Sequence, residues 1–347
     1  MNRRDFLKLT ASTAAAGMAG CATNPTVTPW TGTDRIKAVL LHLGHNMWCE
    51  WLPDDVMKTA EIREKFRPNL NLRNRDEQWR RVTARMAERK LNMLVIDIGE
   101  GLVYPSHPEL AIEGSWSPDK LRDEIIRLRG MGIEAIPKLN FSATHDGWLK
   151  DYHRMLTLPK YYEVVKDVIR DVAEIFQTPR FFHLGYDEET IHNQRASHFA
   201  VVRQGELWWH DFLWFNETVK KTGSRSWIWS DYGWRHKEEF LARMPRDVLQ
   251  SNWYYYHIDG EQDKEHLERI AFFDELDKAG FDQIPCGSAY SWKPNFTELV
   301  RYCRKHLTVS PRLKGFLLAP WTRTWNRFHD KNAYALEAFE MGKTSVK

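Results

Sequence analysis

The sequence lacks several signatures that would place it in a common functional class. It has no glycine-rich phosphate loop of the P-loop or dinucleotide-binding type. No long basic block accompanies its formal net charge of +3, so nucleic acid is not an expected partner. Its four cysteines include no Cys-x-x-Cys pair, which argues against a zinc site built on cysteine. No stretch approaches the roughly 20 consecutive apolar residues of a membrane-spanning helix.

Aromatic residues, by contrast, are abundant. The chain of 347 residues is 42% hydrophobic, enough for one large domain or two ordinary ones, and 13% aromatic. It contains 16 tryptophans. Tryptophan offers a large flat apolar face and one N–H donor, which suits both a protein core and the faces of sugar rings.

The N-terminus has the features of an export signal. Arg3 and Arg4 precede a mild alanine- and glycine-rich stretch, which resembles a twin-arginine signal. Small residues before Cys21 resemble a lipoprotein cleavage site with Cys21 as the lipid-carrying residue. We therefore expect a signal over 1–21, a Pro/Thr-rich tether over 22–34 and one barrel over 35–347. The mature protein is expected to be periplasmic or at the cell surface, contacting the membrane only through that lipid.

Short apolar runs alternate with segments of helical spacing along the rest of the chain. The runs cover 36–43, 91–98, 132–139, 180–186, 226–231, 248–253, 281–288 and 314–321. The helical segments cover 74–90, 118–130, 159–176, 204–221, 264–279 and 294–306. This alternation predicts a parallel sheet covered by helices. Eight repeats favour a single-domain (β/α)₈ barrel, with an open doubly wound sheet as the alternative.

Polar and aromatic residues follow each predicted strand, where barrel enzymes carry their chemistry. In chain order they are His42 and His45; Asp97 and Glu100; Lys138, Asn140, His145 and Asp146; Asp187, Glu188 and Glu189; Trp229 and Asp231; Trp253 and Tyr255; Tyr290 and Trp292; Trp321 and Arg323. Carboxylates ringed by tryptophan and tyrosine suit glycoside cleavage. One carboxyl protonates the leaving oxygen, another stabilises the cation-like transition state, and aromatic faces hold the sugar.

Five segments resemble the catalytic barrel of glycoside hydrolase family 20, the β-N-acetylhexosaminidases. "FFHLGYDEE" (181–189) is similar to that family's His-x-Gly-Gly-Asp-Glu signature, with Tyr186 replacing the second glycine. The other segments are "MAERKLNML" (86–94), "LRGMGIEAIPKLNFSATH" (128–145), "WIWSD" (227–231) and "GFLLAPW" (315–321). The resemblance runs from about residue 36 to 325 and implies an exo-acting, retaining hydrolase of glycans that needs no cofactor or metal.

Carried over position by position, the resemblance makes Glu188 the general acid/base. Asp187 would orient the substrate's own 2-acetamido group, which replaces an enzyme nucleophile, and Tyr290 would donate a hydrogen bond to the acetamide oxygen. An adjacent anion favours the protonated form of a carboxyl, the form that a general acid needs. The remaining expected substrate-binding residues are His42, His45, Asp97, Asn140, His145, Trp229, Asp231, Trp253 and Trp321.

The chain also departs from the family pattern at several strand ends. His42 and His45 stand where the family has Asp and Arg, Val95 and Asp97 where it has a His pair, Lys138 where it has an acid, and Thr322 and Arg323 where a Glu is expected. The small domain that usually precedes the barrel is not recognised. Lys138, Arg323 and the two histidines suggest instead a substituted or acidic sugar, whose carboxylate or sulfate they would meet.

Three alternatives stay open at this point. A metal-dependent hydrolase would use His42, His45 and Asp97, together with His145 and Asp187, at the barrel mouth. A surface-anchored barrel would bind glycans without cleaving them. Asp187 and Glu188 would otherwise be a solvated acidic loop or a helix start, where acids are favoured. His183, within its apolar run, is interpreted as a hydrogen-bonded core histidine.

Overall fold

The computed structural model describes residues 35–321, except 54, 58, 61–62, 64–65, 261 and 308–310. The expected signal, Cys21, the tether and Arg323 lie outside the described residues, and so does Thr322. Export and lipid attachment therefore stay predictions.

Eight parallel strands form one sheet, in the order β6-β5-β4-β3-β2-β1-β8-β7. They are β1 (Ile36–His42), β2 (Met93–Asp97), β3 (Glu134–Lys138), β4 (Phe181–His183), β5 (Arg225–Trp229), β6 (Leu249–Ser251), β7 (Cys286–Gly287) and β8 (Gly315–Leu318). The two ends of this sheet meet through parallel bridges between Gln250 and Gln283 and between Trp253 and Cys286. The ring closes, which excludes the open doubly wound sheet and confirms the predicted (β/α)₈ barrel.

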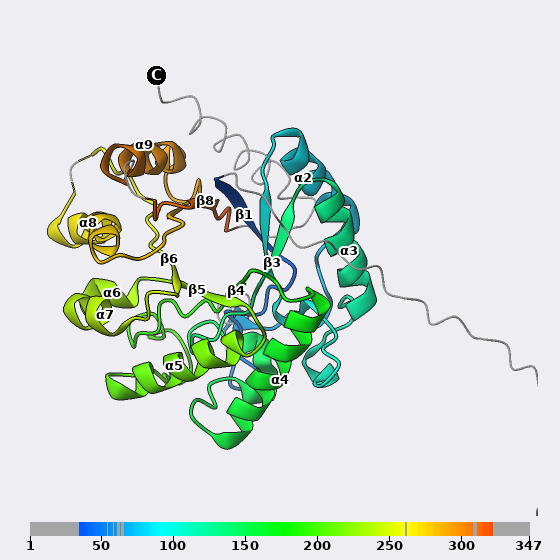
Figure 1. Cartoon of the computed structure of the whole chain (residues 1–347). Helices are drawn as coiled ribbons and strands as arrows, with labels where there is room; N and C mark the ends of the chain where they lie inside the picture. The colour runs from blue at the N-terminus through cyan, green and yellow to red at the C-terminus, as the bar shows by residue number, and fades with distance from the viewer. Residues whose placement is uncertain are drawn as a thin grey trace, which may run out of the picture.

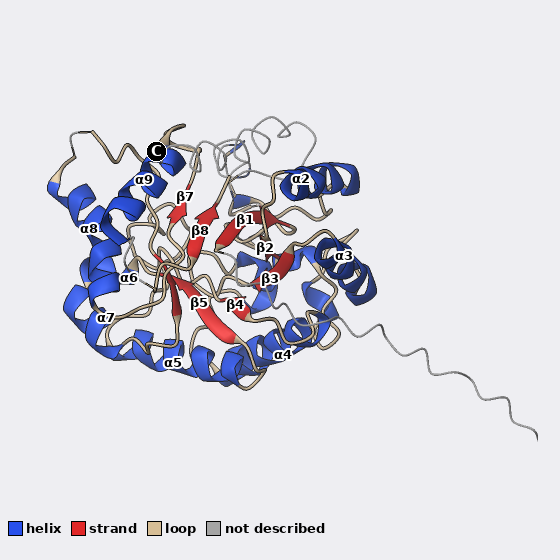
Figure 2. Cartoon of the chain, turned by 45° about the horizontal axis from the view of Figure 1, so that its top comes forward, coloured by secondary structure: helices blue, strands red, loops and turns tan. Residues whose placement is uncertain are grey.

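Helices lie outside the strands, as Figures 1 and 2 show. They are α2 (Asp76–Glu88), α3 (Pro118–Gly130), α4 (Pro159–Ile175), α5 (Glu206–Lys220), α6 (Tyr232–Arg235), α7 (Lys237–Arg243), α8 (Lys264–Lys278) and α9 (Asn295–Leu307), with short 3₁₀ turns η1 (Gly99–Gly101), η2 (Pro108–Leu110) and η3 (Gly147–Tyr152). The six predicted helical segments correspond to α2, α3, α4, α5, α8 and α9. The helices α6 and α7 were not predicted.

Alternation along each strand divides the core in two. In β1, Ala38 and Leu40 belong to the cluster inside the barrel, whereas Val39 and Leu41 pack against the helices. Successive strand side chains point to opposite faces, so both faces of the sheet are apolar and buried. Gly315 permits the close pairing of β8 with β1, because a Cβ at position 315 would lie 1.9 Å from the carbonyl oxygen of Ile36 in β1.

Local sequence signals set the helix starts. Ser117 caps α3 by accepting a hydrogen bond from the backbone N–H of Lys120, and Pro118 occupies the first turn. Asp263 caps α8 in the same way, through the N–H of His266. These caps fix where each helix leaves its loop, and hence how the loops at the barrel mouth are held.

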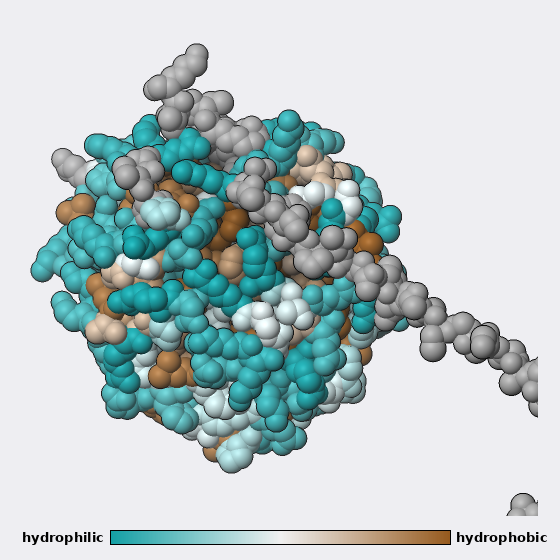
Figure 3. Space-filling model, viewed as in Figure 1, coloured by the Kyte–Doolittle hydropathy of each residue, from teal (hydrophilic) through white to brown (hydrophobic). Residues whose placement is uncertain are grey.

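The outer surface of the barrel is mixed in character. On the face shown in Figure 3, hydrophobic residues are scattered among hydrophilic ones. No helix in the described part of the chain is both long and apolar enough to cross a membrane. Among the described residues, Cys49, Cys286 and Cys303 are buried thiols that form no disulfide.

Candidate active site

The loop that follows β4 carries the acidic run and has an unusual backbone. Gly185, Tyr186 and Glu188 all adopt left-handed conformations, with φ of 69°, 73° and 56°. Gly185 also lies against Asn140, because a Cβ at position 185 would fall 2.2 Å from that side chain. Left-handed non-glycine residues are strained and persist where their surroundings hold them, which is typical of functional loops.

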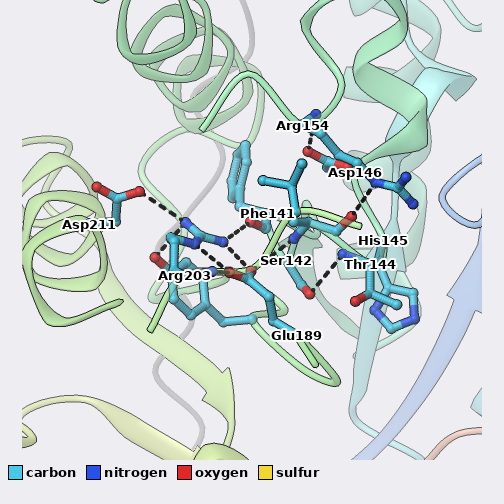
Figure 4. Close-up of polar contacts among 12 residues, drawn as sticks. Phe141, Ser142, Thr144, His145, Asp146, Arg154, Glu189, Arg203 and Asp211 are labelled. Carbon is cyan, nitrogen blue, oxygen red and sulfur yellow. Dashed lines mark hydrogen bonds and ion pairs between the residues drawn. The ribbon is translucent and has the colours of Figure 1, made fainter. Parts of the chain in front are cut away.

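Neighbouring acidic side chains in this loop lie in different environments. Glu189 is buried and pairs with Arg203, whose Nη2 lies 2.5 Å from the carboxylate. The same carboxylate accepts a 2.9 Å hydrogen bond from the backbone N–H of Ala143 in the loop after β3. Arg203 lies between Glu189 and Asp211 of α5 and contacts both (Figure 4). Glu189 is therefore part of the scaffold that joins these loops, and Asp187 and Glu188 remain for chemistry.

Asp187 is buried and held from two sides. Its Oδ1 accepts a 2.7 Å hydrogen bond from the amide of Asn140 and lies 3.3 Å from Nδ1 of His145. Burial opposes ionisation, but the charge of His145 and the hydrogen bonds outweigh it and lower the pKa of Asp187 to about 2. Asp187 is thus a carboxylate at neutral pH.

His145 joins Asp187 to Glu188. Its Nε2 lies 3.4 Å from Oε2 of Glu188, whose side chain is 39% exposed and therefore reachable by a ligand. Burial by itself would favour the neutral imidazole, yet the charge of Asp187 and the two contacts raise the pKa of His145 to about 10. A protonated imidazole therefore bridges the two carboxylates.

Asp231 stands between the acidic loop and the aromatic wall. Its Oδ2 accepts a 2.9 Å hydrogen bond from the backbone N–H of Glu188, and its Oδ1 accepts one of 3.1 Å from the indole of Trp253. Burial and then the nearby Asp187 anion raise the pKa of Asp231 to about 7. This carboxyl changes charge in the neutral range.

Aromatic rings enclose the other side. The rings of Trp253 and Tyr255 are stacked with centroids 4.9 Å apart, and Tyr255 lies 6.0 Å from Trp321. Trp321 in turn lies 6.0 Å from Trp229 and 5.8 Å from His42. Of these rings, those of Trp253, Tyr255 and Trp321 line a cavity together with the acids. Its volume is about 1590 Å³, above the roughly 300–1,000 Å³ of common small-molecule sites.

A row of ionisable residues crosses the barrel interior at the strand ends. His42, Asp97 and Lys138 are register partners on β1, β2 and β3, and Lys138 pairs with His183 on β4. Asp97 lies 3.2 Å from Nδ1 of His42 and accepts a 2.7 Å hydrogen bond from Lys138 Nζ. Burial opposes the charge of Asp97, but Lys138 and His42 hold its pKa well below the usual range. His183 is buried, and its Nδ1 accepts the N–H of Gly185.

The predicted site residues therefore fall into two groups. Those that line the cavity are Asp187, Glu188, His145, Asp231, Trp253, Tyr290 and Trp321. Those buried beneath or beside it are His42, His45, Asp97, Asn140 and Trp229. Tyr290 lies on the rim with its side chain 68% exposed. Lys138 is fully buried and paired with Asp97, so it is not placed to meet a substrate anion.

Several residues of the site were not singled out from the sequence. Trp48, in the loop after β1, lines the cavity, is 41% exposed and lies 6.0 Å edge-on from the ring of His145. Tyr255 was noted at a strand end but not assigned to the site, although it stacks on Trp253. Glu100, which follows β2, binds the β1 loop: its Oε1 accepts the N–H of His45 at 2.5 Å and of Asn46 at 3.0 Å. The abundance of aromatic residues was the sequence signal for Trp48, and Tyr255 had its position at a strand end as well.

The metal alternative can be judged from the donor sets. In the set built on His42, His45 and Asp97, the Lys138 ammonium already contacts the carboxylate that a cation would need. Among the described residues, His145, Asp187 and Glu188 form a donor set that fits a metal ion better, because their ligand atoms lie within 4.8 Å of one another. Its imidazole would have to lose the proton that the two carboxylates favour before binding a metal.

Comparison with solved structures defines the class of fold. No family model matches the sequence, and no curated protein matches it either. The structural neighbours include glycoside hydrolase family 20 β-N-acetylhexosaminidases, which are (β/α)₈ barrels. The likeness is confined to the fold, because identities near 14% carry no functional assignment by themselves.

Three of these neighbours illustrate the match. The exo-β-N-acetylglucosaminidase of Vibrio harveyi, solved with N-acetylglucosamine, has a TM-score of 0.59 and 15% identity over 88% of this chain and 54% of that one. The Bacteroides fragilis β-N-acetylhexosaminidase has a TM-score of 0.56 and 14% identity, over 88% of this chain and 65% of that one. Dispersin B has a TM-score of 0.54 and 14% identity, over 88% of this chain and 98% of that one. The chain thus spans just over half of the Vibrio enzyme and nearly all of dispersin B.

Proposed function

We propose that this protein is a retaining, exo-acting glycoside hydrolase that removes a terminal N-acetylhexosamine or a related amino sugar from glycans. The observation that carries the proposal is the placement of Asp187 and Glu188. Both line one aromatic-walled cavity at the mouth of the barrel. The fold shared with family 20 enzymes supports the same class of reaction.

The chemistry follows from the two carboxyl environments. Glu188, partly exposed, would donate a proton to the glycosidic oxygen. The acetamide oxygen of the substrate would then attack the anomeric carbon as the leaving group departs. Asp187, held ionised by His145, would accept the acetamide N–H and stabilise the positive charge that develops on the ring so formed. Water would open that ring while Glu188 takes the proton back.

Hydrolysis of a panel of aryl glycosides tests this proposal. The wild type is expected to cleave an N-acetyl-β-hexosaminide, and Glu188→Gln should lose about 10²- to 10⁴-fold in kcat, the usual contribution of a general acid. Glu217→Gln is the matched control, because Glu217 is exposed on α5, away from the cavity, and its side chain pairs with Lys220. Activity that survives Glu188→Gln would overturn the assignment of Glu188.

A glycan-binding barrel is the second reading, favoured by the replaced strand-end residues such as Lys138. Binding of N-acetylglucosamine oligomers without turnover by the wild type would support it over hydrolysis. A stoichiometric metal in purified protein, lost on His145→Ala, would support a metal-dependent hydrolase instead.

We also propose that the protein is exported by the twin-arginine route and anchored through Cys21. The sequence of residues 1–21 supports this. Membrane fractionation of the full chain and of Cys21→Ser tests it: the wild type should sediment with membranes, and the variant should not. Equal partition of both would contradict anchoring.

A further inference from the structure

Asp231 joins three neighbouring strands at the barrel mouth. It lies just after β5, accepts the backbone N–H of Glu188 from the loop after β4, and accepts the indole N–H of Trp253 from the segment after β6. Each carboxylate oxygen is thus already bonded to the protein. Asp231, which was expected from the sequence to bind a sugar hydroxyl, thus also ties the proposed acid to the aromatic wall.

The hydrogen bond to Glu188 acts on a strained backbone. Glu188 has φ of 56°, a conformation that non-glycine residues hold only when the surroundings impose it. Its carbonyl oxygen accepts hydrogen bonds from Thr144 Oγ1 at 2.8 Å and from Asn193 Nδ2 at 3.1 Å. Asp231 holds the opposite, N–H side. Of these three partners of the Glu188 backbone only Asp231 ionises, so among them only the Asp231 hydrogen bond depends on pH.

We infer that Asp231 is a positioning residue: its carboxylate fixes both the direction of the Glu188 side chain and the indole of Trp253, and it holds one of them less firmly when protonated. Protonation removes the negative charge and turns one oxygen into a hydroxyl, which is a weaker acceptor, so the N–H group bonded to that oxygen is held much less firmly. This inference rests on the proposed function for its effect on catalysis, but its structural part can be tested without a substrate.

The groups around Asp231 determine the pH at which its carboxyl changes charge. The charged groups facing it are Asp187 and Glu188 from the loop after β4. Burial and the Asp187 charge raise the pKa of Asp231 to about 7, against the opposing effects of the Glu188 N–H and the Trp253 indole. On the α8 side, Arg269 stacks on Trp234, whose ring lies 4.5 Å from that of Trp253. The switch is therefore expected near neutral pH.

The indole N–H resonance of Trp253 reports the switch directly. In full-length protein labelled with ¹⁵N-tryptophan, the resonance is assigned by its loss in Trp253→Phe. We expect it to titrate between pH 5 and 9 with a midpoint of about 7 in the wild type and in the Glu217→Gln control. Asp231→Asn, which cannot ionise, should abolish the titration. A wild-type resonance that does not titrate, or one that titrates equally in Asp231→Asn, would overturn the inference.

The rate profile tests the link to catalysis. The wild-type kcat should fall as the pH drops below about 7, because protonated Asp231 holds the backbone of Glu188 less firmly. Asp231→Asn should lower kcat by roughly tenfold through misplacement of the acid and remove this limb. If the wild type hydrolyses nothing, the proposed function fails, and the NMR titration still decides the inference. If the wild type is active and Asp231→Asn keeps the same limb, the inference fails alone.

Discussion

Lys138 Nζ donates a 2.7 Å hydrogen bond to Oδ2 of Asp97 inside the barrel, and the Lys138 side chain is fully buried. The pair lies in the row of strand-end residues below the cavity. A lysine at this depth is retained only with a charged partner. The pair therefore lies beneath the cavity, and contacts with a substrate would come from the residues that line it.

Removing one member of this pair should be costly. Lys138→Met would leave the buried Asp97 carboxylate with His42 as its remaining neighbour, so we expect a loss of about 3–5 kcal/mol in the free energy of unfolding. The double variant Asp97→Asn, Lys138→Met should be less destabilised than the sum of the two single variants, because the charges are removed together. Urea denaturation measures both. A Lys138→Met protein within 1 kcal/mol of wild type would contradict a tightly held pair.

Stability should also fall at alkaline pH because of His145. Its folded-state pKa is raised from 6.5 to about 10, so its contribution is fully present below pH 6.5 and is lost as the pH rises through 10. Each unit corresponds to about 1.4 kcal/mol, which makes a loss of a few kcal/mol between pH 7 and 10. His145→Gln should flatten this dependence in denaturation experiments at several pH values, whereas the exposed His236→Gln should not. An unchanged slope in His145→Gln would count against the bridged arrangement.

Tyr186 stabilises the acidic loop despite its backbone conformation. Its φ is 73°, but its ring is buried 5.3 Å from that of Trp208, and its hydroxyl accepts a 2.7 Å hydrogen bond from Arg203. Tyr186→Gly should relieve about 1–2 kcal/mol of backbone strain and lose about 3–5 kcal/mol of aromatic packing. We therefore expect a net destabilisation of roughly 1–4 kcal/mol by thermal or urea unfolding. A glycine variant as stable as wild type would show that the ring contributes little.

Adjacent glutamates should respond in opposite ways to the same substitution. Glu189→Gln breaks a buried pair with Arg203 and should cost about 3–5 kcal/mol of stability. Glu188→Gln changes a side chain that is 39% exposed and removes its ion pair with His145, so it should cost at most about 1 kcal/mol of stability while removing most of the activity. Parallel thermal unfolding and rate measurements on the two variants test this division. Equal stability of both would place Glu189 outside the scaffold.

The strand runs and the acidic loop were predictable because they depend on local patterns. Apolar runs located all the strands, and the acids after β4 were expected to face a cavity. What the sequence could not supply was register. The row that pairs His42, Asp97 and Lys138 depends on which residues of separate strands become partners, so these residues were interpreted as ligands of a substrate.

Longer-range pairings were missed for the same reason. Glu189 is joined to Arg203, and Asp231 to both Glu188 and Trp253, by contacts that no local spacing encodes. The helices α6 and α7 are short and directly follow a strand end, so no long periodic segment marked them. Pattern reasoning therefore located the acids that line the cavity but not the contacts that hold them in place.

Calorimetric binding of N-acetylglucosamine-thiazoline tests the central claim most directly, because this compound mimics the cyclic intermediate that Asp187 would stabilise. The account predicts that the wild type binds it at least about 10²-fold more tightly than N-acetylglucosamine, as expected for an analogue of a high-energy state. Asp187→Ala should lose most of that difference while still binding the sugar. No binding to the wild type, or equal affinity in both proteins, would contradict substrate-assisted cleavage at this site.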